Sequence, residues 1–404
     1  MNSEHANLPA ALWRLVLLQA AMNGSHFMVM PLLAVYCSEH LSLSASSIGL
    51  VLAIYFIAAR VTPMVFGPLA DRYGLWPSVI LGLWLRGAGF FGLYFADTEG
   101  LALSTAAILG LGTSIYEAGA YGVIGNQKEA CRERLIIENA RALNLGCILG
   151  PLLGAGLAVY DLALPLLVSG AIFWIMCGVT LCERAPELRA HQRQPIASSL
   201  SAVWQDRAFI LLCLALLPWW ALFAQLFAAF PLEASARGGA ASWASSVLVV
   251  NGSIGLLFLF AIPVIVSRVG ANRTIALGAL IGGLAVAGLA VAKGLPGLLV
   301  LVAVFTCAEV AILAASEILV GRHAAGQSTA TFFAMFNVSW GLCGALGGAI
   351  GPWISTLSSP ALAWCGLGAS ALLTVAGLRV YDVVSKSQLV STASFSRGSD
   401  TLTR

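Results

Sequence analysis

Long apolar runs alternate with short polar breaks along most of the chain. Each run is about 20 residues or more, the length of a helix that crosses a bilayer. The two-residue alternation typical of membrane-spanning strands is absent. The pattern predicts twelve membrane-spanning helices, near residues 13–36, 47–70, 76–96, 101–124, 136–160, 162–182, 208–231, 243–267, 275–292, 296–319, 328–355 and 361–380.

Composition agrees with a membrane protein. Of the 404 residues 59% are hydrophobic and 10% are charged, and the mean hydropathy is +0.90, whereas about 25% of residues are charged in ordinary soluble domains. A hydrophilic stretch at 183–195 divides six spans from six. The sequence therefore predicts an all-α polytopic membrane protein with an N-terminal six-helix bundle at 1–182, a cytoplasmic linker at 183–207, a C-terminal six-helix bundle at 208–384 and a disordered cytoplasmic tail at 385–404.

Basic residues are distributed unevenly between the two sides of the predicted membrane. If both termini are cytoplasmic, only Arg237 and Lys293 of the 21 lysines and arginines lie in outer loops, and Arg60, Arg86 and Arg141 lie within spans. The positive-inside rule then favours cytoplasmic termini, as expected for an inner-membrane protein. The net charge of +3 reflects this bias and gives no reason to expect a nucleic-acid partner.

No motif for a metal, a nucleotide or catalysis occurs. The nine cysteines lie mostly in spans, without a C-x-x-C pair or a metal-ligand spacing. No G-x-x-x-x-G-K-[ST] loop supports ATP-driven transport, and no H-E-x-x-H helix supports an intramembrane enzyme. We therefore expect no metal, no cofactor and no enzymatic activity, and an ion gradient, which we take to be of protons, as the driving force.

Glycine and proline motifs recur at about half the chain length. The sequence DRYG at 71–74 is echoed by SRVG at 267–270, an offset of 196 residues, and Gly150-Pro151 is echoed by Gly351-Pro352, an offset of 201. The members of each pair fall at the same place in the two halves, after the second span and in the fifth. This spacing indicates two repeated halves, an arrangement common in transporters.

A charged stretch, GPLADRYG, follows the second apolar run. We expect Gly67 and Gly74 to let the backbone turn tightly, Asp71 to face a helix N-terminus, and Arg72 to pair locally or to bind anionic headgroups. The alternative is an ordinary polar loop whose arginine follows the positive-inside rule.

The spacing G-x-L-x-D-R-x-G in a chain of twelve spans resembles the signature loop of the major facilitator superfamily. In that family the loop latches the two halves together on the cytoplasmic side in the outward-facing state. The resemblance covers essentially the whole chain through span count, linker and half-repeat. The basic residues that often follow the last glycine are replaced here by Leu75, Trp76 and Pro77.

The fifth span reads NLGCILGPLLGAG. Gly146, Gly150 and Gly154 share one helix face and Pro151 bends the helix, roles that close helix packing alone would explain. The pattern G-x-x-x-G-P-x-x-G is also similar to the antiporter signature of the drug:proton exporters within the superfamily. The stretches LRGAGF at 85–90 and GLGTSIYEAGAYG at 110–122 resemble bacterial multidrug exporters of that branch. The resemblance implies a monomer whose cavity is lined by helices 1, 4, 7 and 10.

Three acidic residues, Glu117, Glu309 and Glu317, lie within predicted spans, where a charge is costly unless it is paired, protonated or turned inward. Arg60 reaches a similar depth to Glu117, so the two can pair, and Arg86 can reach an acidic group across the bundle. We rank Glu117 first and Glu309 second as the proton carrier, and expect Glu317 to be a gate or surface residue. A static ion pair that fixes helix packing is the alternative.

Candidate substrate-binding residues lie on the helices that the resemblance places around the cavity and on helix 11. Aromatic stripes in helices 7 and 11 usually serve packing or lipid contact, but in a cavity they form an adaptable surface for large amphipathic compounds. The candidates are Asn23, His26, Tyr116, Trp219, Trp220, Phe223, Gln225 and Asn337.

These features favour proton-coupled export of a small amphipathic compound by alternating access. The compound is either a drug or an endogenous metabolite such as a siderophore. The alternatives are a proton-coupled importer of a small nutrient and a non-transporting membrane receptor on the same fold. The expected partners are a small-molecule substrate, protons and the lipid bilayer.

Overall fold

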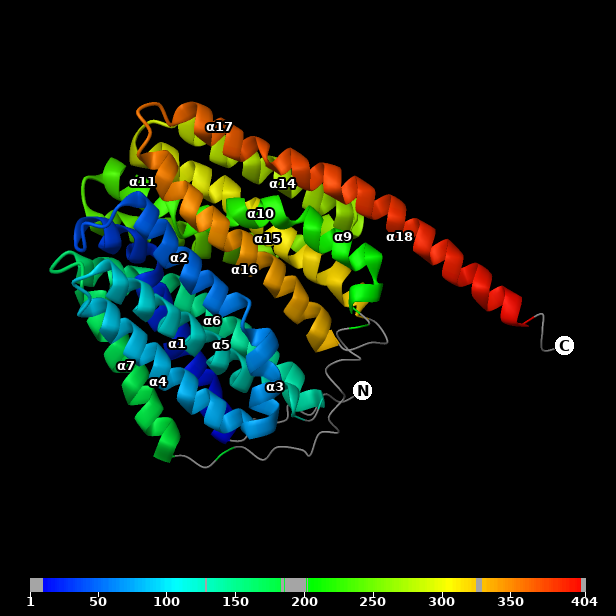
Figure 1. Cartoon of the computed structure of the whole chain (residues 1–404), viewed down its shortest axis with the longest axis horizontal. Helices are drawn as coiled ribbons and strands as arrows, with labels where there is room; N and C mark the ends of the chain where they lie inside the picture. The colour runs from blue at the N-terminus through cyan, green and yellow to red at the C-terminus, as the bar shows by residue number, and fades with distance from the viewer. Residues whose placement is uncertain are drawn as a thin grey trace.

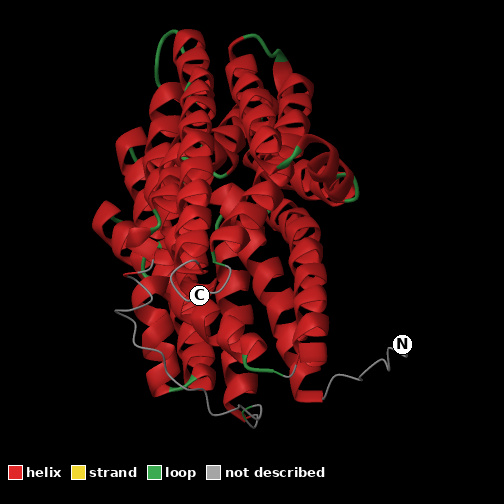
Figure 2. Cartoon of the chain, turned by 90° about the vertical axis from the view of Figure 1, so that its right-hand side faces the viewer, coloured by secondary structure: helices red, strands yellow, loops and turns green. Residues whose placement is uncertain are grey.

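The computed structural model describes residues 10–127, 129–182, 185, 201, 203–324 and 329–400. Helices joined by short loops make up this part of the chain (Figure 2). Eleven helical segments are long and apolar enough to cross a membrane. The helix α4 (Leu75–Tyr94), which has 20 residues and contains Arg86, lies at the third predicted span, near 76–96, and is not among these eleven.

The helices form two halves that lie beside each other (Figure 1). The N-terminal half contains α1 (Ala10–Glu39), α2 (Ala45–Arg60), α3 (Pro63–Tyr73), α4, α5 (Glu99–Gly125), α6 (Glu129–Ala158) and α7 (Leu164–Cys182). The C-terminal half contains α9 (Arg207–Ala215), α10 (Leu217–Phe223), η1 (Ala224–Leu226), α11 (Ala229–Gly238), η2 (Ala241–Ala244), α12 (Ser245–Leu259), α13 (Ile262–Val269), α14 (Ala271–Ala287), η3 (Gly288–Ala290), α15 (Gly294–His323), α16 (Thr329–Ser355), α17 (Ala361–Ala369) and α18 (Ala371–Asp400).

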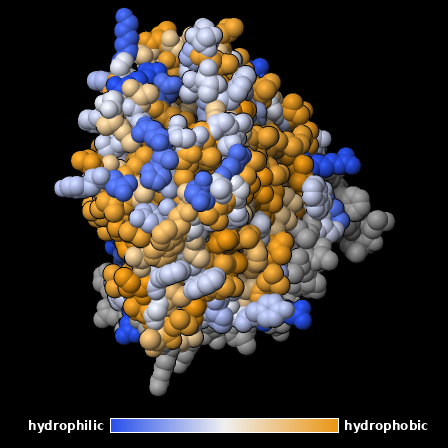
Figure 3. Space-filling view, turned by 60° about the vertical axis from the view of Figure 1, so that its left-hand side comes forward, coloured by the Kyte–Doolittle hydropathy of each residue, from blue (hydrophilic) through white to orange (hydrophobic). Residues whose placement is uncertain are grey.

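Each half has its own hydrophobic core, and further apolar side chains face outward. Leu17, Leu257, Phe260 and Leu362 are among the large apolar residues that are exposed. In Figure 3 hydrophobic side chains cover much of the flank, and hydrophilic side chains gather over part of the face turned toward the viewer. So much apolar surface is typical of a protein that is surrounded by lipid.

The two halves touch along two helix pairs and at the end of the molecule opposite the linker. Helix α2 packs on α16, and α6 packs on α12, while α1 also contacts α11 and η2. The Ser235 hydroxyl donates to Glu39 Oε1 over 3.0 Å, and Leu32, Val35 and Ala244 are buried together. We call these five residues the distal seal, because they join the halves at the end far from the linker.

The GPLADRYG stretch is helical rather than a loop. It occupies the end of α3, and Gly74 alone joins α3 to α4, with φ 118° and ψ 134°. The tight turn predicted from the two glycines is right for Gly74 and wrong for Gly67, which lies inside α3. Arg72 is exposed, with its guanidinium 5.7 Å from the ring centre of Tyr73. The side chain of Asp71 lies outside the described part of the chain, and the latch role of this stretch stays a prediction.

The half-repeat predicted from sequence has a backbone counterpart. Gly270 joins α13 to α14 with φ 86°, just as Gly74 joins α3 to α4. Pro151 lies inside α6 and Pro352 inside α16, the fifth spanning segments of the two halves. Glycine is needed at both joints because positive φ angles are strained for other residues.

The last helix is longer than predicted. A disordered tail was expected from Ser385, but α18 continues to Asp400. The sequence from Ala371 to Arg397 contains no proline and only one glycine, and Lys386 pairs with Asp382 one turn earlier over 2.8 Å, so little interrupts the helix. Residues 401–404 lie outside the described part of the chain.

The C-terminal end of the predicted linker is tied to the C-terminal half, while most of its other residues lie outside the described ranges. His323 Nδ1 lies 2.7 Å from Asp206 Oδ2, and its Nε2 lies 3.0 Å from the Tyr381 hydroxyl. Asp206 also accepts the backbone N–H of Phe209 and so caps α9. Burial raises the pKa of Asp206, but these hydrogen bonds outweigh it and hold the pKa below its ordinary value.

The two glycines of GPLADRYG are expected to respond differently to alanine. Gly67→Ala should leave the protein as stable or raise its stability by about 0.5–1 kcal/mol, because Gly67 is helical and an added Cβ would meet no atom within 4 Å. Gly74→Ala should lower stability by about 1–3 kcal/mol, because alanine is strained at a φ of 118°. Thermal unfolding of the detergent-solubilised variants measures both; equal midpoints for the two would contradict the assignment.

Candidate functional site

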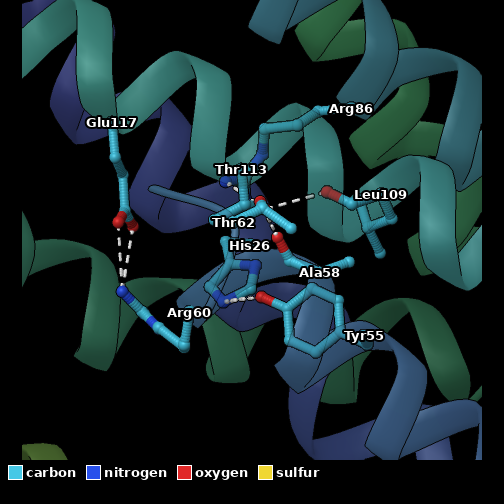
Figure 4. A network of polar contacts seen from close by, with 9 residues as sticks. All are labelled: His26, Tyr55, Ala58, Arg60, Thr62, Arg86, Leu109, Thr113 and Glu117. Carbon is cyan, nitrogen blue, oxygen red and sulfur yellow. Dashed lines mark hydrogen bonds and ion pairs between the residues drawn. The ribbon is translucent and has the colours of Figure 1, made fainter. Parts of the chain in front are cut away.

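An ion pair lies inside the N-terminal half, between α2 and α5. Arg60 Nη1 lies 3.0 Å from Glu117 Oε2 and 3.3 Å from Oε1 (Figure 4). The side chains of Arg60 and Glu117 are 23% and 20% exposed, so the pair is largely but not fully buried. The pairing predicted from depth along the helices is confirmed, whereas its role in proton coupling stays a prediction.

A break in the second spanning segment places Arg60 at a helix end. Helix α2 stops at Arg60, and α3 starts at Pro63, which has no backbone N–H to continue the hydrogen-bond ladder. The Thr62 hydroxyl donates to the carbonyl oxygen of Ala58 over 2.6 Å. The guanidinium of Arg60 therefore belongs to the last turn of a helix, where carbonyl groups favour a positive charge.

Arg60 also contacts the opposite half. Its guanidinium carbon lies 4.1 Å from the ring centre of Trp340 on α16. The helices approach closely beside this contact, since a Cβ added to Gly341 would lie 2.7 Å from the Cβ of Arg60. Sequence reasoning missed Trp340 and chose Asn337, a half-buried residue three positions earlier on the same helix.

The second embedded arginine does not have the acidic partner that we expected. Arg86 on α4 is 1% exposed, and its Nη1 donates to the Thr113 hydroxyl over 3.0 Å. Its guanidinium lies 4.7 Å from the ring centre of Phe173. No carboxylate in the described ranges forms an ion pair with it, because Thr113 stands one turn before Glu117 on α5 and Glu117 reaches Arg60 instead.

Two predicted binding residues on α1 have different surroundings. His26 Nε2 lies 3.4 Å from the Tyr55 hydroxyl, beside the network that holds Arg86 and Arg60 (Figure 4). Asn23 is buried against α6, where a Cβ added to Gly146 would lie 2.5 Å from the Cβ of Asn23. The structure thus brings His26, and not Asn23, to the charged network.

Tyr116 is used within the N-terminal half. It is fully buried, and its hydroxyl donates to Gln19 Oε1 over 2.6 Å. Gln19 Nε2 in turn donates to Asn139 over 2.6 Å, so the chain of hydrogen bonds joins α5, α1 and α6. Sequence reasoning missed both amides, and this connection makes Tyr116 a helix-packing residue rather than a free binding group.

The buried acid of the C-terminal half has a neutral partner. Glu309 on α15 is 8% exposed and accepts a hydrogen bond from Asn251 on α12. Asn251 also donates to the Thr306 hydroxyl over 3.0 Å. In the described part of the chain no arginine or lysine pairs with Glu309. Glu317, two turns further along α15, is exposed, which fits the surface or gate position expected for it.

The candidates of the seventh predicted span, which lie on α10 and η1, separate into packing residues and site residues. Trp219 stacks on Phe305 with a centroid distance of 5.4 Å, inside the C-terminal core. Gln225 donates to the carbonyl oxygens of Ala221 and Gly347, each over 2.8 Å, so its amide N–H groups are already used. These contacts argue against substrate binding by Trp219 and Gln225.

Trp220 and Phe223 lead instead toward the ion pair. Their rings lie 6.1 and 5.6 Å from the ring of Trp340, and Phe223 also meets Phe227 at 5.7 Å. Phe227 reaches Phe56 of α2 at 6.0 Å. An aromatic cluster therefore extends from α10 across the boundary between the halves to Arg60.

The predicted antiporter motif packs directly on α1. A Cβ added to Gly150 would lie 2.5 Å from the carbonyl oxygen of Gly24, and one added to Gly154 would overlap the carbonyl oxygen of Met28. Gly146 meets Asn23 in the same way, and Pro151 is buried inside α6, about two turns before its C-terminal end. The glycine face thus serves close helix contact; its antiport role stays a prediction.

Comparisons with known proteins agree with this architecture. Residues 15–348 match the family described as Major Facilitator Superfamily. Proteins from Yersinia pestis and Yersinia pseudotuberculosis named multidrug resistance protein MdtH are 24% identical over 358 residues, which cover 87% of this chain and 89% of the relative.

Solved transporters have the same fold. The nucleoside transporter NupG superimposes with a TM-score of 0.72 at 17% identity and covers 92% of this chain and 99% of its own. The POT family transporter PepTSo superimposes with a TM-score of 0.75 at 13% identity and covers 95% and 99%. The chain therefore belongs to the Major Facilitator Superfamily, and it is a multi-pass membrane transporter rather than an enzyme.

Proposed function

We propose that the protein exports a small amphipathic compound from the cytoplasm in exchange for protons. The observation that carries the proposal is the Arg60–Glu117 pair, an ionised group and its counter-ion held inside a membrane-spanning half beside the boundary with the other half. The relatives named multidrug resistance proteins support export of amphipathic compounds. A drug or an endogenous metabolite such as a siderophore would both suit the aromatic cluster.

Glu117 is the proposed proton carrier. While Arg60 lies beside it, the positive guanidinium attracts the negative carboxylate across 3.0 Å. Proton uptake neutralises the carboxylate and leaves Arg60 without its counter-ion. The pair then loses its electrostatic attraction, and Arg60 is free to adopt another position.

The arrangement of the halves supports alternating access. The distal seal joins them at the end opposite the linker, and the predicted orientation places the linker and both termini in the cytoplasm. On that orientation the structure corresponds to the state with its outer end closed. We place the protein in the inner membrane as a monomer.

Proteoliposomes loaded with acidic buffer test the proposal. Wild-type protein should accumulate ethidium, an amphipathic cation, when the interior is acidic, and ethidium should drive proton movement when no pH gradient is imposed. Glu117→Gln should reduce gradient-driven accumulation to the level of empty liposomes while keeping ethidium exchange without a gradient. The neutral amide cannot release or take up the proton.

Glu138→Gln is the matched control. Glu138 also pairs with an arginine, Arg141, over 2.9 Å; Glu138 is 13% exposed and Arg141 72%, so in this pair the cation is open to its surroundings. Gradient-driven accumulation by Glu117→Gln equal to that of Glu138→Gln would overturn the mechanism. Coupling in which protons and ethidium move in the same direction would indicate an importer, and ethidium binding without flux in the wild type would indicate a receptor.

A further inference from the structure

We propose that Trp340 is a positioning residue that links proton uptake at Glu117 to the movement of the halves. Its indole ring holds Arg60 from the C-terminal half, while Glu117 holds the same guanidinium from the N-terminal half. The inference rests on the proposed function of the ion pair and names the group that transmits its change.

Arg60 has one attractive partner in each half. The carboxylate of Glu117 lies 3.0 Å away on α5, and the ring centre of Trp340 lies 4.1 Å away on α16. The face of an indole ring attracts a guanidinium through the ring quadrupole. Both contacts are present at once, so the two partners hold one cation together, one from each half.

The ring is fixed within its own half. Trp340 contacts Trp220 at 6.1 Å and Phe223 at 5.6 Å, both on α10. A displacement of the C-terminal half therefore carries the ring with it, instead of being absorbed by rotation of the indole.

The helix pair that bears the contact has no room to slide without changing it. A Cβ added to Gly341 would lie 2.7 Å from the Cβ of Arg60, and one added to Gly49 would lie 2.6 Å from the Cα of Ala349. Helices this close move past each other only by separating. Separation of α2 from α16 necessarily lengthens the distance between Arg60 and Trp340.

The direction of coupling follows from this joint hold. While α2 and α16 are together, Trp340 keeps Arg60 beside Glu117, and the ion pair is at its strongest. When the helices separate, Arg60 loses the ring and is held less firmly beside the carboxylate. A proton on Glu117 removes the ion pair and with it part of the advantage of the joined arrangement, so proton uptake shifts the equilibrium toward separation.

Removal of the ring should shift the pH dependence of transport. In Trp340→Leu nothing holds Arg60 in place from the C-terminal half, so the ion pair should weaken and the pH of half-maximal transport should move higher by about half a unit, a two- to fivefold change in proton concentration. Other ionisable groups near the pair are His26, Tyr55, Arg86, Tyr116 and Tyr121, and Glu317 of α15 interacts electrostatically with Tyr121; all are retained in this variant.

Two further variants decide between positioning and packing. Trp340→Phe keeps an aromatic face and should shift the pH profile in the same direction by less, which also serves if the leucine variant does not fold. Trp353→Leu, on the same helix with an exposed side chain, should leave the profile unchanged.

A double variant separates failure of the inference from failure of the proposed function. Glu117→Gln is expected to keep ethidium exchange without a gradient, and in that background Trp340→Leu should have no further effect on the pH profile of this exchange, because no carboxylate remains to titrate. If Glu117→Gln itself leaves the wild-type profile intact, the proposed function fails. If Glu117→Gln flattens the profile but Trp340→Leu matches Trp353→Leu, the role of Trp340 is overturned.

Discussion

Replacing Gly150 with alanine is expected to destabilise the protein and to lower the amount of folded protein that can be extracted from the membrane. The new Cβ would lie 2.5 Å from the carbonyl oxygen of Gly24, a backbone atom that cannot rotate away. Overpacking of this kind typically costs about 1–3 kcal/mol, and each 1.4 kcal/mol changes an equilibrium about tenfold. Gly154→Ala should have the same effect, because its Cβ would overlap the carbonyl oxygen of Met28.

Gly156→Ala, in the same helix, is the matched control. A Cβ at Gly156 would meet no atom within 4 Å, so this variant should accumulate and melt like the wild type. The yield of monodisperse protein after detergent extraction and its thermal midpoint measure the difference. Equal yields and midpoints for Gly150→Ala and Gly156→Ala would show that the close approach of α6 to α1 is not needed for folding.

Joining Glu39→Cys to Ser235→Cys with a short bifunctional thiol reagent is expected to stop transport completely. The native Ser235 hydroxyl and Glu39 Oε1 lie 3.0 Å apart in the distal seal. Both line a pocket of about 610 Å³ through which the reagent can enter. An exporter must open this end in every cycle, so a covalent bond across it holds the protein in one state. Cleavage of a reducible reagent should restore the wild-type rate.

The variants that carry only Glu39→Cys or only Ser235→Cys are the controls for this experiment. Each retains the nine native cysteines, so reaction at those thiols affects the singles and the double variant alike. Each single should keep transporting after treatment. Transport by the cross-linked double variant at the rate of the singles would contradict the requirement that the distal seal opens.

The fold was predictable because the lipid bilayer constrains it strongly. Spans must be long and apolar, so they could be located from hydropathy: eleven helical segments in the described part of the chain meet these criteria, and α4, which contains Arg86, lies where a further span was predicted. The interruption after Arg60 was not predicted, because a proline near a helix break and a proline inside a continuous helix look alike in sequence. Pro63 begins a new helix, whereas Pro151 lies within one.

The charged site was predictable only in part. Arg60 and Glu117 were paired from their depth along two helices, and the contact is present. Depth does not reveal the direction in which a side chain points around the helix axis, and this is why Arg86 was expected near an acid and instead meets Thr113. Trp340 was missed for another reason, since its contact depends on how the two halves pack.

The connections at Gly74 and Gly270 limit where residues can be inserted into this chain. One residue, Gly74, separates α3 from α4, and one residue, Gly270, separates α13 from α14. A connection of one residue is too short to accept an epitope tag, a protease site or a natural insertion. Length changes are expected at the wider corners, such as residues 40–44 between α1 and α2, where several residues share the turn.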